Sequence, residues 1–389
     1  MSKKLLSLYI HWPFCLSKCP YCDFNSHVRE QIDENLWKKC LLSEMEHMAT
    51  LVGPRKLRSI FFGGGTPSLM SPKTVEALIE AAQSHWPDEG VEITCEANPN
   101  SVEAQKFRDF KSAGVNRVSL GIQSLNPSAL QFLGRTHSKL EAIEAIEIAR
   151  NTFDRYSFDL IYTRPDQKVQ EWQQELQEAL SIAGDHLSLY QLTIEEGTVF
   201  HTLFSRGQHT LPEEETSAQL FEITQDIMNA HGLPAYEISN HAREGQECQH
   251  NLQYWQYRDY VGIGPGAHGR ITLDGKKYAT RCHRAPETWT QKVQQQNHGI
   301  QDFISLSWEV RFQELVMMGL RLQQGISKTD FSQELGKEIV DVWNNEILQP
   351  YMTEGLLEMT PTHMRATPKG LQKLNALTRA LLGEVELKS

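Results

Sequence analysis

Apolar positions in the first half of the chain follow two alternating spacings. Short runs of consecutive or alternating apolar residues are typical of buried β-strands, whereas apolar residues at every third or fourth position are typical of amphipathic helices. These patterns predict β-strands at residues 7–12, 58–65, 91–99, 117–124, 157–165 and 186–194. They predict helices between the strands at residues 34–48, 72–86, 104–114, 139–151 and 169–184.

This alternation predicts an α/β fold. Strands separated by helices pair in parallel through right-handed crossovers. A unit recurs about every 30 residues, which is the spacing of (β/α) barrels. The pattern stops after six strands, whereas a complete barrel has eight. We therefore predict a partial (β/α)6 barrel, similar to a TIM barrel that lacks its last two units.

The second half of the chain has a different character. A helical pattern at residues 212–232 precedes residues 233–269, which have little helical period and are rich in glycine, histidine and aromatic residues. We expect a strand, a loop and a further strand that cover one side of the barrel. Helical patterns return from about Ser305, with a hairpin around Pro361 and a last helix, in an order similar to a winged helix. The predicted domains are residues 1–235, 236–300 and 301–389.

Composition limits the classes of function. The 389 residues carry a formal net charge of −11, which argues against a general nucleic-acid-binding role and favours packing over DNA binding for the winged-helix-like domain. No uninterrupted apolar run approaches the roughly 20 residues that cross a bilayer. The two lysines and short apolar run at the N-terminus lead into cysteines without a small-residue cleavage site. The sequence therefore predicts a cytoplasmic protein with no transmembrane segment.

Three of the seven cysteines lie within eight residues, at Cys15, Cys19 and Cys22. Disulfides are rare in cytoplasmic proteins, so this cluster favours a metal site. Cys40 and Cys95 fall in a helical and a strand pattern, where buried and inert thiols are expected. A closed metal site usually has four protein ligands, whereas a site that binds a substrate often leaves one position open.

Two metals suit three clustered cysteines. Zinc needs a fourth ligand, which His11 or His27 could provide. A [4Fe–4S] cluster also needs four ligands, but a bound small molecule can supply one of them. The spacing alone leaves both alternatives open.

Glycine and polar residues fall at the ends of the predicted strands. Residues 63–65 are three glycines that end the second strand, and glycines there let the backbone amides approach a ligand. Glu96, Gln123 and Asp159 lie in or near the ends of the next three strands. Because the carboxyl ends of parallel strands meet at one mouth, we expect these residues and the cysteines to form one site.

The motif CxxxCxxC after the first strand, followed by GGGTP after the second, resembles the radical S-adenosylmethionine (SAM) superfamily. The resemblance implies that Cys15, Cys19 and Cys22 hold three irons of a [4Fe–4S] cluster. The amine and carboxylate of SAM then chelate the fourth iron, which accounts for the open position. An electron from the cluster cleaves the sulfonium, and this chemistry belongs to the cofactor.

Further motifs resemble the coproporphyrinogen-dehydrogenase-like branch of that superfamily. They are LYIHWPFC, FFGGGTPS, CEANP, VSLGIQS, LGRTH and FDLIYTRP, and the resemblance covers nearly the whole chain. It implies SAM contacts at Tyr9, Gly64, Gly65, Thr66, Glu96, Gln123, Arg135 and Asp159. Glycine amides and Arg135 suit the carboxylate of SAM, and Glu96 suits its cationic end. Asp159 and Gln123 suit the ribose hydroxyls or the amine.

Within this branch the resemblance is closest to the HemW-type haem chaperones. The oxygen-independent coproporphyrinogen III oxidases have a fourth cysteine two residues after the third, where this chain has Phe24. The chaperones instead have an HNxxYW signature, present here at residues 250–255. The signature implies that His250 ligates haem iron while Tyr254 and Trp255 pack on the macrocycle. A buried histidine among core aromatics is the alternative, and Cys248 is a rival iron ligand.

We therefore predict a haem chaperone on a radical SAM scaffold, which binds haem as cargo and delivers it to haem-requiring apoproteins such as respiratory proteins at the membrane. The alternative is an oxygen-independent coproporphyrinogen III oxidase, which decarboxylates two propionates to give protoporphyrinogen IX. A zinc-stabilised structural protein is the third hypothesis. Enzymatic activity stays open, because the radical SAM residues are all present.

Overall fold

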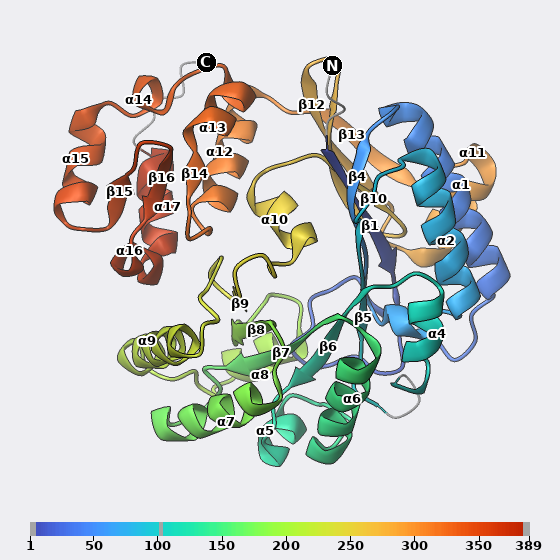
Figure 1. Cartoon of the computed structure of the whole chain (residues 1–389), viewed down its shortest axis with the longest axis horizontal. Coiled ribbons are helices and arrows are strands. Elements are labelled where there is room, and N and C mark those ends of the chain that lie inside the picture. The colour runs from blue at the N-terminus through green and yellow to red at the C-terminus, as the bar shows by residue number, and fades with distance from the viewer. Residues whose placement is uncertain (1–4, 101–103, 384–389) are drawn as a thin grey trace.

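The computed structural model describes residues 5–100 and 104–383, so the outer ends of the first and third predicted domains lie outside it. One curved sheet of eleven strands runs through the larger part of the molecule, in the order β13-β12-β11-β10-β1-β4-β5-β6-β7-β8-β9 (Figure 1). A smaller, mainly helical domain lies beside it. The prediction of an α/β fold with a partial barrel and a helical C-terminal domain is confirmed.

The six predicted strands form the parallel part of the sheet. They are β1 (Leu5–Trp12), β4 (Lys56–Gly64), β5 (Glu92–Ala97), β6 (Arg117–Gln123), β7 (Arg155–Tyr162) and β8 (His186–Gln191), each parallel to the next. The helices on the outer side of this sheet are α1 (Glu34–Val52), α2 (Pro72–His85), α4 (Phe107–Ser112), α6 (Lys139–Thr152), α7 (Val169–Ile182) and α9 (Glu214–Ala230) (Figure 1). Shorter elements between them are β2 (Phe14–Cys15), β3 (His27–Val28), η1 (Pro67–Leu69), α5 (Pro127–Phe132) and α8 (Val199–Ser205).

Strand β1 shows how the sheet separates the core from the site. Leu6, Leu8 and Ile10 are completely buried in the main hydrophobic core under the outer helices. Because side chains alternate between the two faces of a strand, the intervening residues Tyr9 and His11 face the inside of the barrel. The apolar residues of β1 therefore stabilise the fold, and its polar and aromatic ones are left for a ligand.

Residues 233–269 contain the two predicted strands, but these strands join the two ends of the parallel sheet, and a helix stands between them in place of the predicted loop. Strand β9 (Asn240–Ala242) pairs antiparallel with β8, and a helix, α10 (Gln249–Trp255), follows. Strand β10 (Tyr260–Ile263) then pairs parallel with β1 at the other end of the barrel. Helix α10 has only two turns, too few for its period to stand out in the sequence.

The sheet continues past β10 through three antiparallel strands. These are β11 (His268–Leu273), β12 (Lys276–Cys282) and β13 (Ile300–Ser305), with α11 (Pro286–Gln296) between the last two. The apolar residues Val261 and Ile263 of β10 are completely buried, so burial favours its docking against the free edge of β1.

The C-terminal domain has its own hydrophobic core. Its elements are α12 (Trp308–Gly319), β14 (Ile326–Ser327), α13 (Lys328–Leu335), α14 (Ile339–Val342), α15 (Asn345–Thr353), β15 (Leu357–Met359), β16 (His363–Ala366), α16 (Pro368–Gln372) and α17 (Leu374–Gly383). The hairpin predicted around Pro361 is confirmed by the antiparallel pair β15 and β16. Tyr257, which follows α10, packs into this second core and ties the two parts together.

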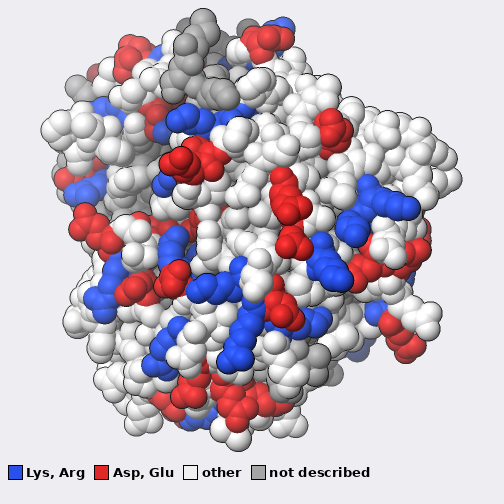
Figure 2. All heavy atoms as spheres, turned by 45° about the vertical axis from the view of Figure 1, so that its right-hand side comes forward, with Lys and Arg blue, Asp and Glu red and all other residues white. Residues whose placement is uncertain are grey.

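The surface charges and the helices of the folded chain bear on the classes of function considered above. On the face drawn in Figure 2, basic and acidic side chains are interspersed. Among the described residues, no helix combines the length and the apolar character needed to span a membrane.

Candidate functional site

Two adjoining pockets open inside the barrel. The first, which we call the cysteine pocket, is lined by all three clustered thiols, and each of these cysteines is partly exposed and free of disulfides. Its other lining residues come from the carboxyl ends of the parallel strands and the loops after them. They include Gly64, Gly65, Thr66, Glu96, Asn98, Gln123, Arg135 and Asp159.

The structure brings most of the predicted site residues together in this pocket. Of the predicted SAM contacts, all but Tyr9 line the cysteine pocket, and Tyr9 lines the neighbouring one. Neither His11 nor His27, the two candidates for a fourth zinc ligand, lines the cysteine pocket. In the part of the chain that the structure describes, no three His, Cys, Asp or Glu side chains are arranged to hold a single metal ion.

The glycines of the GGGTP motif are required by close backbone packing. Gly64 has φ +109°, and a Cβ there would meet the His11 ring at 2.4 Å. A Cβ on Gly65 would meet the carbonyl oxygen of Phe14 at 2.7 Å. The amide of Gly64 points into the site, where it donates to the Glu96 carboxylate at 3.2 Å. The amide of Gly65 donates to the carbonyl oxygen of Trp12 at 2.7 Å, so the glycine run allows close backbone packing and does not present a row of free donors.

Two neighbouring carboxylates are among the residues that line the cysteine pocket. Burial, with the neighbouring charge of Asp159, raises the pKa of Glu96 to about 8. Burial also raises the pKa of Asp159 to about 6. Two partly buried carboxyl groups of this kind favour a cationic ligand, because a positive charge between them stabilises their ionised forms.

Arg135 is fixed above the thiols by three hydrogen bonds. Its guanidinium donates to Cys19 Sγ at 3.3 Å, to Asn98 Oδ1 at 2.6 Å and to the carbonyl oxygen of Gly121 at 2.8 Å. The Nε–H of Arg135 is buried and has no hydrogen-bond partner among the described residues. A buried unpaired donor is costly, so this N–H suits a ligand oxygen.

This set of groups fits an iron–sulfur cluster with an amino-acid-like ligand. Three thiols provide soft ligands for iron. The unpaired Nε–H of Arg135 suits a carboxylate, and Glu96 with Asp159 suits an ammonium or sulfonium group. Thiols, anion donors and cation acceptors therefore surround one space.

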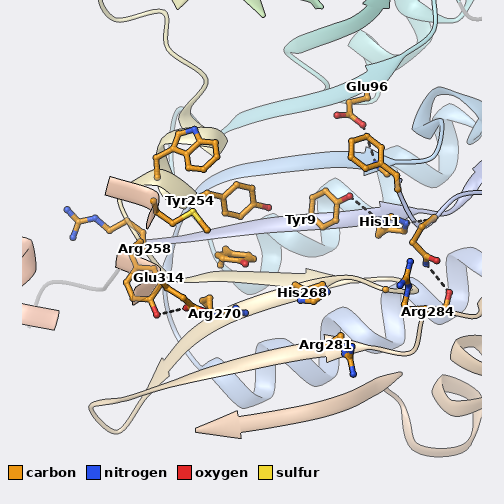
Figure 3. A pocket seen from close by; sticks show the side chains of 18 residues that line it. Tyr9, His11, Glu96, Tyr254, Arg258, His268, Arg270, Arg281, Arg284 and Glu314 are labelled. Carbon is orange, nitrogen blue, oxygen red and sulfur yellow. Dashed lines mark hydrogen bonds and ion pairs between the residues drawn. The ribbon is translucent and has the colours of Figure 1, made fainter. Parts of the chain in front are cut away.

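The second pocket, which we call the aromatic pocket, has a volume of about 580 Å³. It lies between the inner face of β1, β10, β11 and β12 and the helices α10 and α12 (Figure 3). Its lining residues are Tyr9, His11, Phe24, Asn25, Gly64, Glu96, Tyr254, Trp255, Tyr257, Arg258, Tyr260, Gly266, His268, Arg270, Arg281, Arg284, Glu314 and Met318. Phe24, Gly64 and Glu96 line both pockets, so the two spaces adjoin at these three residues.

Helix α10 is anchored by a buried carboxylate at its first turn. Glu92 on β5 accepts hydrogen bonds from the backbone amides of Gln249 and His250, both at 3.1 Å, and pairs with Arg155 at 2.7 Å. Burial alone would raise the pKa of Glu92, but Arg117, Arg155 and the amides hold it below its ordinary value. This anchor fixes the HNxxYW segment over the barrel and directs Tyr254 and Trp255 into the aromatic pocket.

The structure places His250 beneath the aromatic pocket and not in its lining. The side chain is 1% exposed, its Nδ1 bonds to Ser59 Oγ at 2.8 Å, and its Nε2 bonds to Tyr254 Oη at 2.8 Å. Cys248 is also buried, and burial raises the pKa of its thiol to about 12. The packing of His250 corresponds to the alternative of a buried histidine among aromatics, and its role as a haem ligand stays a prediction.

Sequence patterns missed most of the aromatic pocket. The missed residues are Tyr257, Arg258, Tyr260, His268, Arg270, Arg281, Arg284 and Glu314. The richness of residues 233–269 in aromatic residues, histidine and glycine is a signal for Tyr257, Tyr260 and His268, whereas the other missed residues beyond position 269 have no such signal. The arginines come from separate strands and loops, and only the pairing of β10, β11 and β12 brings them together.

Comparisons with known proteins identify the family to which this chain belongs. Residues 9–179 match the family model of the Radical SAM superfamily, and residues 306–372 match that of the HemN C-terminal domain. The mitochondrial radical S-adenosyl methionine domain-containing protein 1 of Bos taurus is 38% identical over 98% of this chain and 88% of its own. The heme chaperone HemW of Bacillus subtilis is 32% identical over 97% of this chain and 100% of its own.

The chain belongs to the radical SAM superfamily, in the family of the HemW haem chaperones. HemW of Escherichia coli is a further member, 41% identical over 74% of this chain and 76% of its own. The solved structure of coproporphyrinogen III oxidase (HemN) from Escherichia coli has the same fold, with a TM-score of 0.81 at 20% identity over 97% of this chain and 90% of its own. Because relatives include mitochondrial and bacterial proteins, a cytoplasmic location stays a prediction.

The raised pKa of Glu96 predicts a pH-dependent stability of the cofactor-free protein. Between the ordinary pKa of 4.5 and the folded value of about 8, the folded chain keeps a proton that the unfolded chain has lost. The free energy of unfolding therefore falls as pH rises through this window. We expect Glu96→Gln to flatten this slope in urea unfolding measured from about pH 5 to about pH 8.5. Glu89→Gln, at an exposed position, is the control; an equal flattening in both variants would contradict the prediction.

The two hydrogen bonds of His250 predict a structural role for this residue. His250→Ala leaves a cavity and removes a partner from the Tyr254 hydroxyl, so we expect the free energy of unfolding to fall by about 2–4 kcal/mol. His268→Ala is the matched control, because its side chain is exposed, and it should cost less than about 0.5 kcal/mol. Equal stability of the His250→Ala variant and the parent in denaturant unfolding would show that these two hydrogen bonds do not contribute to the free energy of unfolding.

Proposed function

We propose that this protein is a haem chaperone that holds a [4Fe–4S] cluster and SAM in the cysteine pocket and haem in the aromatic pocket. It passes the haem to haem-requiring respiratory proteins. The observation that supports this function is the aromatic pocket itself, which combines aromatic walls with arginines and adjoins the cofactor pocket. Relatives named heme chaperone HemW, which match nearly the whole chain, support the same function.

The lining of the aromatic pocket suits the two parts of haem. The macrocycle is planar and apolar, and Tyr254, Trp255 and Tyr260 offer aromatic surface for it. A volume of about 580 Å³ lies within the range of cofactor sites. The propionates are carboxylates, which arginine recognises through paired N–H donors.

The arginines of the pocket differ in how far they are already paired. Arg270 forms a bidentate pair with Glu314, at 2.7 and 2.9 Å, and Arg281 pairs with Asp302 at 2.6 Å. Arg258 pairs with Asp330 at 2.8 Å. The Arg284 guanidinium is exposed and has no described hydrogen-bond or ion-pair partner. Arg284 can therefore bind a haem propionate without giving up an existing hydrogen bond or ion pair.

In the cysteine pocket, this chain's residues bind and orient the cofactor. Cys15, Cys19 and Cys22 would hold the cluster, which together with SAM supplies one-electron chemistry. Arg135 orients the carboxylate end of SAM, while Glu96 and Asp159 face its cationic end.

The alternative, a coproporphyrinogen III oxidase, is favoured by one observation. The pockets adjoin at Phe24, Gly64 and Glu96, so a porphyrinogen in the aromatic pocket would lie beside the cofactor. Phe24 argues against it, because this chain has a phenylalanine at the sequence position where the oxidases have their fourth cysteine. The likeness to HemN, at 20% identity, shows the fold alone.

Haem binding tests the role assigned to Arg284. In an anaerobic optical titration, we expect a saturable Soret change for the parent and an affinity about five- to twentyfold weaker for Arg284→Ala, because one charged contact to a propionate is lost. Arg206→Ala, at an exposed position outside the pocket, is the control. The dimethyl ester of haem should bind the parent and the Arg284 variant equally. A difference between haem and its ester that survives in Arg284→Ala would contradict the assignment.

Iron analysis tests the three cysteines. After anaerobic reconstitution we expect about four irons and four sulfides per chain in the parent. Cys19→Ser should lose most of both, since the cluster then has one protein ligand fewer. Cys40→Ala, which alters a cysteine of helix α1 outside the pocket, should keep the parent's iron content. Unchanged iron and sulfide in Cys19→Ser would show that the cluster lies elsewhere.

A further inference from the structure

His268 lies on the wall of the aromatic pocket formed by the extension of the sheet. It is the first residue of β11 and sits directly opposite Arg281 of β12, two residues before Arg270. Residues opposite each other in neighbouring strands, and residues two apart in one strand, share a face of the sheet. Figure 3 shows the imidazole of His268 on the pocket side, between Tyr9 and Arg281 in that view.

Three histidines lie in or beside this pocket, and their ring nitrogens differ. His11 bonds through Nδ1 to Tyr9 Oη at 3.0 Å and through Nε2 to the carbonyl oxygen of Asn25 at 2.9 Å. His250 also has both nitrogens bonded, to Ser59 and Tyr254. The side chain of His268 is exposed to the pocket and has no hydrogen-bond partner among the described residues. Of the three, only His268 can offer a ring nitrogen to a ligand without breaking an existing bond.

The surroundings of His268 keep its imidazole in the form that binds metals. Burial lowers its pKa, and the nearby charges of Arg270, Arg281 and Arg284 lower it further, while Asp302 opposes them. A neutral imidazole has a free lone pair on one nitrogen, which is the form that ligates iron.

A glycine in β10 lets the start of β11 pack closely beside Tyr9. Gly262 of β10 is the sheet neighbour of Tyr9, and a Cβ there would meet the carbonyl oxygen of His268 at 2.0 Å. Any larger residue would therefore clash with the start of β11. The first residue of β11 is thus held close to β10, which fixes the backbone from which the His268 side chain reaches the pocket.

We propose that His268 is the histidine that ligates the haem iron in the aromatic pocket. This inference rests on the proposed haem function and replaces His250 by His268 as the iron ligand. Arg281 and Arg284 lie on the same side of the pocket as His268, so one edge of the site offers both an iron ligand and partners for carboxylates (Figure 3). His250 then acts as a positioning residue, which holds Tyr254 against the pocket.

The test compares ferric haem binding by the full-length, anaerobically reconstituted protein with that of His268→Ala and His250→Gln. Optical and electron paramagnetic resonance spectra report the axial ligand, and titration reports the affinity. We expect His268→Ala to lose the spectrum of the histidine-ligated parent and to bind haem at least about tenfold more weakly. Added imidazole should restore the parent spectrum in this variant. His250→Gln, whose amide can keep one of the two hydrogen bonds, should retain the parent spectrum.

The outcomes separate this inference from the proposed function. If the parent binds haem and His268→Ala keeps its spectrum and affinity, the iron ligand is not His268, and haem binding itself stands. Loss of the parent spectrum in His250→Gln alone, with cluster content and unfolding midpoint unchanged, likewise overturns the assignment in favour of His250. If the parent gives no saturable haem binding, the proposed function fails together with the inference.

Discussion

The parallel pairing of β10 with β1 is the constraint on which the rest of the site depends. Ser7 to Ile10 of β1 lie in register with Tyr260 to Ile263 of β10, while the other edge of β1 pairs with β4. This makes β1 an inner strand with a pocket on either side. The cysteine pocket lies over β4 to β7, and the aromatic pocket lies over β10 to β12. Without β10, β1 would be the edge strand of the sheet. The arginines of β11 and β12 would then have no sheet surface next to β1.

The two pockets are separated by very little protein. Phe24, Gly64 and Glu96 line both, and Gly64 has no side chain because the ring of His11 fills that space. Glu96 accepts a hydrogen bond from the Gly64 amide, and its carboxyl group faces the boundary. Cargo in the aromatic pocket and the cofactor in the cysteine pocket would therefore be neighbours, so occupation of one pocket can affect the other through these residues. In this account Phe24 is the largest side chain between the two ligands.

The cysteine pocket could be predicted because its signals are local. The three cysteines lie within eight residues, and GGGTP and Glu96 end adjacent parallel strands, so the order of elements is enough to bring them together. The aromatic pocket could not, because β10 is four residues long and its partner β1 lies about 250 residues earlier. No feature of the sequence near Tyr260 indicates that β10 pairs with β1. A local signature points to His250, but only the folded structure shows that both of its nitrogens are bonded and that His268 faces the pocket.

The central claim is that one chain holds an iron–sulfur cluster and a haem in two adjoining pockets. The most direct measurement is anomalous scattering at the iron edge from crystals of the reconstituted protein soaked with haem. The account predicts two separate iron peaks, one beside Cys15, Cys19 and Cys22, and one in the aromatic pocket next to His268. A haem iron peak outside the aromatic pocket, or a cluster peak alone in crystals whose optical spectrum shows bound haem, would contradict it.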